Sequence, residues 1–226
     1  LNIIQLIGTN VKNVILGFMV ATAFLSMWIS NTATSVMMLP IGMSIISQLM
    51  DNPKTVENEN QNFGKALMLA IAYSASIGGM ATLIGTPPNL VLATIVQETY
   101  GIEITFSKWF MFGLPISLIL LAICWKYLTE IAFTFKQKKF PGGRNEINKQ
   151  LKSLGKLSYE EKMVLLIFVG TAFAWITRSF LLQKLIPNLD DTIIAVIAGI
   201  LLFILPASKS KNRKLINWEE AVKLPW

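Results

Sequence analysis

Two clusters of polar and helix-breaking residues interrupt long uncharged stretches of this 226-residue chain. Ser30-Asn31-Thr32 lies within residues 13–50 and Gly85-Thr86-Pro87-Pro88-Asn89 lies within residues 66–97, and neither stretch contains Asp, Glu, Lys or Arg. Hydroxyls, amides and released backbone carbonyls bind ions and small polar molecules. Such groups are costly at membrane depth unless they line a cavity or hold a ligand. Paired interruptions in neighbouring apolar segments are typical of binding sites in transporters.

The composition indicates a multi-pass membrane protein, because 53% of the residues are hydrophobic, only 15% are charged and the mean hydropathy is +0.55. The chain has no His and one Cys, Cys124, which excludes a His/Cys metal site and a disulfide framework. An intramembrane enzyme would need a nucleophile or metal ligands at depth, so we expect no enzyme. The net charge of +7 resides in connectors between apolar segments, which favours membrane topology over nucleic-acid binding.

Residues 13–50 are too long for one membrane span. As a single helix they would extend about 57 Å, roughly twice the hydrocarbon core. We therefore expect a re-entrant hairpin over 13–50, with the first arm ending at Ser30 and the second beginning near Asn31-Thr32. The alternative is an ordinary polar turn between two short spans at the membrane surface.

Residues 65–97 predict a helix broken at Gly85–Asn89. Pro87 and Pro88 lack backbone N–H groups, so the preceding turn keeps unbonded carbonyls that can serve as ligands. The alternative is a simple kink, but Gly, Thr, two Pro and Asn in succession remove too many hydrogen bonds for a bend. We expect Asn89 to cap the second half-helix.

The remaining chain predicts a long span at 109–135, a basic connector at 136–158 and spans at 163–182 and 192–205. This topology places sixteen of the twenty Lys and Arg residues on one side, which by the positive-inside rule is cytoplasmic. We therefore predict an all-α protein that crosses the inner (cytoplasmic) membrane several times. Because the chain begins without Met and ends at Trp226 beside an apolar segment, we expect it to be a piece of a longer protein.

The charge inventory restricts what the two interruptions can bind. A hairpin tip presents one helix C-terminus with partial negative charge and one N-terminus with partial positive charge, so it can hold a cation and an anion. No basic side chain of these segments can balance an anion, and no carboxylate can hold a cation. Neutral oxygen ligands suit Na⁺ better than Mg²⁺ or Ca²⁺. A cation and an anion that compensate each other favour each other's binding, which is a physical basis for symport.

Two motifs resemble those of the divalent anion:sodium symporter family, whose members include dicarboxylate, citrate and sulfate transporters. Residues 26–40 (SMWISNTATSVMMLP) resemble its first Ser-Asn-Thr hairpin, and residues 77–90 (IGGMATLIGTPPNL) resemble its first unwound helix. The basic linker and residues 216–226 also fit, so the resemblance covers essentially the whole chain. The family has two inverted repeats, and this chain resembles the first, without the opening scaffold spans or the second repeat.

The resemblance implies half of an elevator-type transporter, which works as a homodimer and moves a transport domain against a fixed scaffold. Residues 1–108 would belong to the transport domain, 109–158 would form a long span and a cytoplasmic linker, and 159–226 would hold further spans and the start of the second repeat. The sodium ligands implied by the resemblance are Ser26, Ser30, Asn31 and Gly85. The implied contacts to a substrate carboxylate are Asn31, Thr32, Thr86 and Pro87. Thr86 stands where relatives often carry Ser, and both residues offer a hydroxyl.

The expected function is sodium-coupled symport of a small divalent anion, with a C4-dicarboxylate such as succinate as the expected substrate. Na⁺ is the coupling ion, and no other cofactor is expected. A sodium-independent dicarboxylate or anion exchanger and a sodium:sulfate symporter on the same fold are the alternatives. A non-transporting membrane scaffold would leave the two polar interruptions unexplained.

The depth of Ser30 separates the re-entrant hairpin from the surface turn. In a background that lacks the native thiol (Cys124→Ala), we expect Ser30→Cys to react with a membrane-impermeant thiol reagent far more slowly than Asp51→Cys in the polar connector. Added substrate and Na⁺ should slow the reaction further. Equal labelling rates at the two positions would show that the turn is a surface loop.

Overall fold

The computed structural model describes residues 10–50, 57–135, 155, 157–207 and 213–222. The elements of this part are all helices, and Pro206 and Lys214 form an isolated bridge of extended backbone, so the all-α prediction is confirmed. The chain divides into two compact units, one comprising 1–104 and 108–154 and the other comprising 105–107 and 155–226.

The helices of the first unit are α2 (Val11–Ser26), α3 (Asn31–Met50), α4 (Glu57–Gly79), α5 (Pro87–Tyr100) and most of α6 (Phe106–Lys126), which continues as the π-helical η1 (Tyr127–Ala132). The second unit has α8 (Tyr159–Thr177), the π-helical η2 (Arg178–Leu182), α9 (Gln183–Leu185), α10 (Asp191–Ile204) and α11 (Trp218–Ala221).

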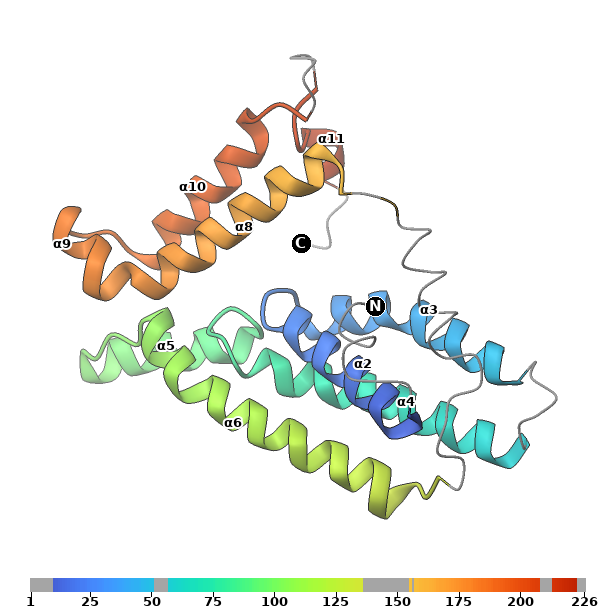
Figure 1. The fold of residues 1–226 in the computed structure, drawn as a ribbon. Helices are drawn as coiled ribbons and strands as arrows, with labels where there is room; N and C mark the ends of the chain where they lie inside the picture. The colour runs from blue at the N-terminus through green and yellow to red at the C-terminus, as the bar shows by residue number, and fades with distance from the viewer. Residues whose placement is uncertain (1–9, 51–56, 136–154, 156, 208–212, 223–226) are drawn as a thin grey trace. The chain divides into compact units, whose positions relative to one another are not determined.

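Helix α4 is the centre of the first unit and packs against both α2 and α3 (Figure 1). The face that α2 turns inward is fully buried and carries large side chains such as Ile15 and Phe18. The buried face of α4 is rich in small residues, among them Ala66, Ala70 and Gly78. Because lipid is as apolar as these side chains, helix association in a membrane depends on close packing, which small residues allow.

The helical breaks fall close to the expected positions. Helices α2 and α3 form a hairpin joined by residues 27–30, and α4 and α5 are separated by residues 80–86. The first arm ends at Ser26, four residues before the expected Ser30. The turn of the hairpin therefore begins about one helical turn before the polar triplet. The depth of this hairpin in a bilayer stays a prediction.

Helix α4 also begins earlier than expected. The polar composition of residues 51–64 predicts a connector, but residues 57–64 are helical. Glu57 and Glu59 lie in the first turn, where carboxylates interact favourably with the positive end of the helix dipole. The rest of that connector, 51–56, lies outside the described residues, as does most of the basic linker at 136–158.

Two described helical segments are long and apolar enough to cross a membrane, namely Phe106–Ala132 and Tyr159–Leu185. The apolar helices Val11–Ser26 and Asp191–Ile204 are shorter, with 16 and 14 residues. At 1.5 Å per residue they extend about 24 and 21 Å, less than the roughly 30 Å hydrocarbon core. The length of α2 therefore suits an arm of a hairpin that enters the bilayer without crossing it.

In the second unit α8 packs against α10, and both helices begin with side-chain caps. Ser158 and Glu161 form a capping box on α8: the Glu161 amide donates to Ser158 Oγ (3.1 Å) and the Ser158 amide donates to Glu161 Oε2 (2.7 Å). Asp190 caps α10 by accepting from the Ile193 amide at 2.7 Å. The Ser-x-x-Glu spacing before an apolar run was available in the sequence as a signal for this helix start.

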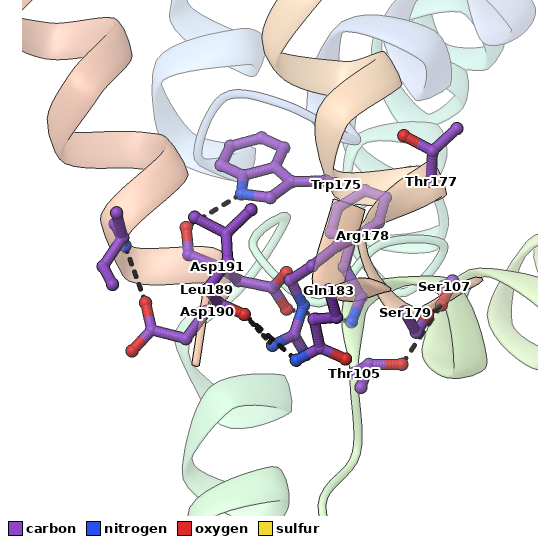
Figure 2. Close-up of polar contacts among 12 residues, drawn as sticks. Thr105, Ser107, Trp175, Thr177, Arg178, Ser179, Gln183, Leu189, Asp190 and Asp191 are labelled. Atoms are coloured by element: carbon purple, nitrogen blue, oxygen red, sulfur yellow. Dashed lines mark hydrogen bonds and ion pairs between the residues drawn. The ribbon is translucent and has the colours of Figure 1, made fainter. Parts of the chain in front are cut away.

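A buried ion pair joins the turn after α8 to the start of α10 (Figure 2). Arg178 is only 2% exposed, and its Nε lies 2.8 Å from Asp191 Oδ1 while its Nη1 donates to the Leu189 carbonyl at 3.1 Å. The position of Asp190-Asp191 next to an apolar segment predicts a solvated span end, and this prediction is wrong for Asp191. Its carboxylate also accepts the Phe106 amide (3.1 Å), and the Phe106 ring stacks on Trp175, which groups residues 105–107 with this unit.

Gly78 marks the closest approach of α4 to α2, because a Cβ atom there would lie 2.3 Å from the Ala23 carbonyl oxygen. The obstacle is backbone, so Gly78→Ala should force the two helices apart and lower the free energy of unfolding by about 1–3 kcal/mol. Thermal unfolding in detergent measures this change. Gly170→Ala in α8 is the matched control, since a Cβ there meets nothing within 4 Å. Equal melting temperatures of the two variants would contradict the close packing of α2 on α4.

Candidate ion and substrate site

The turn of the α2–α3 hairpin lies directly against the break between α4 and α5. A Cβ atom on Gly79, the last residue of α4, would lie 2.2 Å from Asn31 Oδ1, so the Asn31 amide occupies the space beside this glycine. The Thr82 hydroxyl, in the loop of the break, donates to the Met27 carbonyl in the hairpin turn. The two polar interruptions, about 50 residues apart in the sequence, thus form one site.

Three oxygen atoms converge where the hairpin meets α4. Ser26 Oγ lies 2.7 Å from Asn31 Oδ1 and 2.7 Å from the Ala75 carbonyl oxygen, and Ser26 is completely buried. The hydroxyl of Ser26 has a single proton and can donate to only one of these acceptors. Either the Asn31 amide rotates to donate its NH₂, or a cation supplies the missing positive charge. An oxygen-rich, partly buried cluster without ionised groups is suited to a monovalent cation.

The start of α3 provides the positive end of a helix dipole at the same place. Ser30 acts as the N-cap, since its Oγ accepts the Ala33 amide at 3.3 Å and its carbonyl accepts the Thr34 amide at 2.9 Å. The Thr34 bond is the first intrahelical bond, so the amides of Asn31 and Thr32 precede it. Amides in this position favour negative charge nearby.

The loop of the break folds back on the end of α4. A Cβ on Gly85 would lie 2.5 Å from the Gly79 carbonyl oxygen, so only glycine allows this approach. Asn89 is buried, and its Nδ2 donates to the carbonyls of Gly79 (3.0 Å) and Thr82 (2.8 Å). The expectation that Asn89 caps α5 is therefore wrong. Its side chain binds carbonyls of the loop and of the end of α4, and Thr86 is the N-cap of α5.

The start of α5 is unusual for an anion site. Pro87 and Pro88 occupy its first turn, so the two N–H groups most exposed at this end do not exist. The Asn89 amide already donates to the Thr86 carbonyl at 3.1 Å. The Thr86 side chain makes no capping bond to α5 and stays available, so a hydroxyl and not the backbone is the main polar group offered here.

The structure brings some of the expected site residues together and leaves others at its rim. Ser26 and Asn31 are in contact, and Gly85 joins them through Gly79. The remaining residues expected at the site lie in or next to the first turns of α3 and α5, where Ser30, Thr32 and Pro87 are exposed and Thr86 is half-buried.

Sequence reasoning missed three contributors to the site, namely the Ala75 carbonyl, the Gly79 backbone and the Thr82 hydroxyl. Gly78-Gly79 is visible in the sequence as an interruption, but which of the two glycines faces the hairpin depends on the helix packing. No local pattern identifies a carbonyl inside α4 as a ligand. Across the described residues no group of three or more His, Cys, Asp or Glu could hold a metal ion.

An apolar helical chain whose hairpin tip meets a broken helix has the architecture of a secondary transporter. Sequence comparison identifies the family: residues 1–226 match the model of the sodium:sulfate symporter transmembrane region, and the chain belongs to this divalent anion:sodium symporter family. It is 47% identical to sodium-dependent dicarboxylate transporters SdcS of Staphylococcus aureus strains USA300 and NCTC 8325, and 46% identical to that of strain RF122.

These alignments include all of this chain but only 44% of the length of each relative. The chain therefore spans less than half of the proteins that it matches. Because the family consists of symporters, the prediction that the chain belongs to a class of transporters, and not of enzymes, is confirmed.

Gly79→Ala tests whether Asn31 is a functional ligand. The new methyl group would meet the amide of a side chain, which can rotate away, whereas at Gly78 it would meet backbone. We therefore expect Gly79→Ala to lower the free energy of unfolding much less than Gly78→Ala does. We also expect it to raise the sodium concentration for half-maximal transport at least tenfold in the complete protein. Parental sodium dependence in a folded Gly79→Ala protein would remove Asn31 from the site.

Proposed function

We propose that the complete protein performs sodium-coupled symport of a small divalent anion, with a C4-dicarboxylate such as succinate as substrate. The observation that carries this proposal is the cluster of Ser26, Asn31 and Ala75 oxygens beside the positive N-terminus of α3. The 47% identity to a protein named as a sodium-dependent dicarboxylate transporter supports both the ion and the substrate class.

The coupling follows from the charges that this site lacks. The hairpin turn and the break contain no ionised side chain, so neither segment supplies a charge that would neutralise a cation or a dianion bound there. Each ligand lowers the electrostatic cost of the other, and by thermodynamic linkage the effect is equal in both directions. In the proposed cycle Na⁺ binds first and orders the Asn31 amide and the Gly85 loop. The dianion then binds at the start of α3.

The residue roles follow the same division. The proposed sodium ligands are Ser26 Oγ, Ser30 Oγ, the Asn31 amide oxygen and the Gly85 backbone. The proposed substrate contacts are the Asn31 and Thr32 amides and side chains, the Thr86 hydroxyl and the start of α5 at Pro87. Inverted repeats of this kind complete a site from both halves, so a second sodium site and the other half of the substrate shell would come from sequence outside this chain.

We propose an elevator mechanism in a homodimer, with the protein in the inner membrane and its basic connectors in the cytoplasm. The division of the chain into two compact units supports a mechanism in which one unit moves as a body. The uneven distribution of Lys and Arg among the connectors supports the orientation. In this scheme residues 1–108 belong to the transport domain, 109–158 form a long span and the cytoplasmic linker, and 159–226 hold further spans and the start of the second repeat.

Two other activities fit the same fold and are separated by transport measurements. A sodium-independent exchanger would transport dicarboxylate without Na⁺ but would require internal counter-substrate. A sodium:sulfate symporter, which the description of the matching family names, would transport sulfate in preference to succinate. The neutral site suits both anions, so the size and shape of the substrate shell must discriminate between them.

Uptake of labelled succinate by the complete protein in proteoliposomes tests the proposal. We expect uptake to require an inward Na⁺ gradient and to be inhibited more strongly by unlabelled succinate than by sulfate or citrate. Asn31→Ala removes a ligand shared by ion and substrate, which is worth about 1.5–3 kcal/mol, so both apparent affinities should fall about 10- to 100-fold. Asn58→Ala, on the exposed first turn of α4, is the control and should behave as the parent. Sodium dependence that is unchanged in Asn31→Ala would refute the scheme.

A further inference from the structure

One face of α6 lies against the end of α4, where the helix breaks. Trp109, Gly113 and Ser117 follow one another at intervals of four residues and therefore share a face. Trp109 Nε1 donates to the Met80 carbonyl at 3.0 Å, and Ser117 Oγ donates to the Ile77 carbonyl at 2.9 Å. Between them, a Cβ on Gly113 would lie 2.7 Å from the Met80 carbonyl oxygen, so the glycine permits this close approach.

The carbonyls of Ile77 and Met80 belong to the segment that α4 leaves unsatisfied. The last four carbonyls of a helix have no intrahelical partner, and in an apolar surrounding each needs one. Among the backbone bonds of the described turn, the Ile77 carbonyl accepts only the long bond from the Met80 amide, at 3.3 Å. Two donors from α6 therefore satisfy carbonyls on either side of Gly78-Gly79, and they fix the direction of the peptide groups between them.

The segment fixed in this way is the one that contacts the proposed ion site. Gly79 lies against the Asn31 amide, and its carbonyl is approached by Gly85 and accepts from Asn89. A small rotation of the peptides between Ile77 and Met80 would thus move the surface on which Asn31 rests. Because Na⁺ ligands must be placed within tenths of an ångström, α6 controls the site without contributing a ligand.

The Ser117 hydroxyl, like that of Ser26, donates to a carbonyl of another helix. Serine and threonine inside apolar helices usually donate to the carbonyl four residues earlier, as Thr129 does to Trp125 (2.8 Å) and Thr171 does to Ile167 (2.8 Å). Ser117 is only 3% exposed and donates to a different helix. Its hydroxyl is thus used to connect α6 to the break of α4 and not to satisfy α6 itself.

We propose that Ser117 and Trp109 are positioning residues for the sodium site, which hold the Ile77 and Met80 carbonyls and thereby orient Gly79 against Asn31. The proposal rests on the function proposed above, since it assigns these residues to the same ion site. It predicts that their loss changes the affinity for Na⁺ more than the affinity for the anion, because the peptides that they hold adjoin the ion ligands.

The test uses the complete protein in proteoliposomes with succinate as the transported probe. Ser117→Ala should raise the sodium concentration for half-maximal uptake three- to tenfold, with the KM for succinate at saturating Na⁺ and the maximal rate near parental values. Ser117→Thr keeps a hydroxyl and should restore most of the sodium affinity. Trp109→Phe removes the N–H and keeps the ring, and should shift the sodium affinity in the same direction.

Thr129→Val is the matched control, since it removes a buried hydroxyl from the same continuous helix that is bonded only within that helix. Its sodium affinity should stay parental. A purely structural role predicts instead a lower melting temperature with unchanged sodium affinity, which would overturn the proposal, as would equal shifts in Ser117→Ala and Thr129→Val. If the parent itself transports succinate without Na⁺, the proposed function fails first. If the parent needs Na⁺ and the variants match it, only the positioning role is refuted.

Discussion

The need to satisfy backbone carbonyls at a broken helix governs the described structure of the first unit. A helix that ends inside an apolar environment leaves carbonyls that water cannot reach, and each unsatisfied one costs several kcal/mol. Side chains around the break meet this need as hydrogen-bond donors. Ser117 donates to the Ile77 carbonyl and Trp109 to the Met80 carbonyl. Asn89 donates to the carbonyls of Gly79 and Thr82. The break is thus a built feature whose polar groups are assigned to partners, with Ser26 and Asn31 placed where an ion can enter the network.

The two units manage buried polarity in different ways. The second unit contains an ionised pair, in which Arg178 and Asp191 compensate each other and also receive backbone and side-chain hydrogen bonds. A pair of this kind is permanent, because removing one partner leaves an uncompensated charge at a cost of about 3–5 kcal/mol. The hairpin and the break of the first unit contain no ionised side chain, so in the proposed symport the charge at that place is only that of the bound Na⁺ and dianion. Permanent ionisation suits a rigid element, and neutrality suits a site that must be loaded and emptied.

The sequence predicted the elements of the site better than their boundaries. The positions of Ser30-Asn31-Thr32 and Gly85–Asn89 inside uncharged stretches were enough to predict a hairpin and a broken helix, because few other arrangements tolerate such groups at depth. The end of α2 at Ser26 and the start of α4 at Glu57 were missed, since both depend on tertiary packing of polar residues that are compatible with helix or loop. Residue type alone could not show that Asn89 serves the loop carbonyls or that Asp191 finds Arg178, because each bond joins elements whose approach is set by the fold.

The adjacent glycines Gly78 and Gly79 show why packing and function are hard to separate in this fold. At Gly78 the absent side chain lets α4 touch the backbone of α2 at Ala23, and at Gly79 it makes room for the Asn31 amide. Since successive residues of a helix point about 100° apart, one glycine faces the helix of the first arm while the next faces the start of the second arm. The same turn of α4 therefore sets the spacing of the hairpin and the geometry of its tip. A movement that changes how α2 packs on α4 therefore also changes the oxygen cluster of Ser26, Asn31 and Ala75, which in the proposed function would couple the conformation of the hairpin to ion binding.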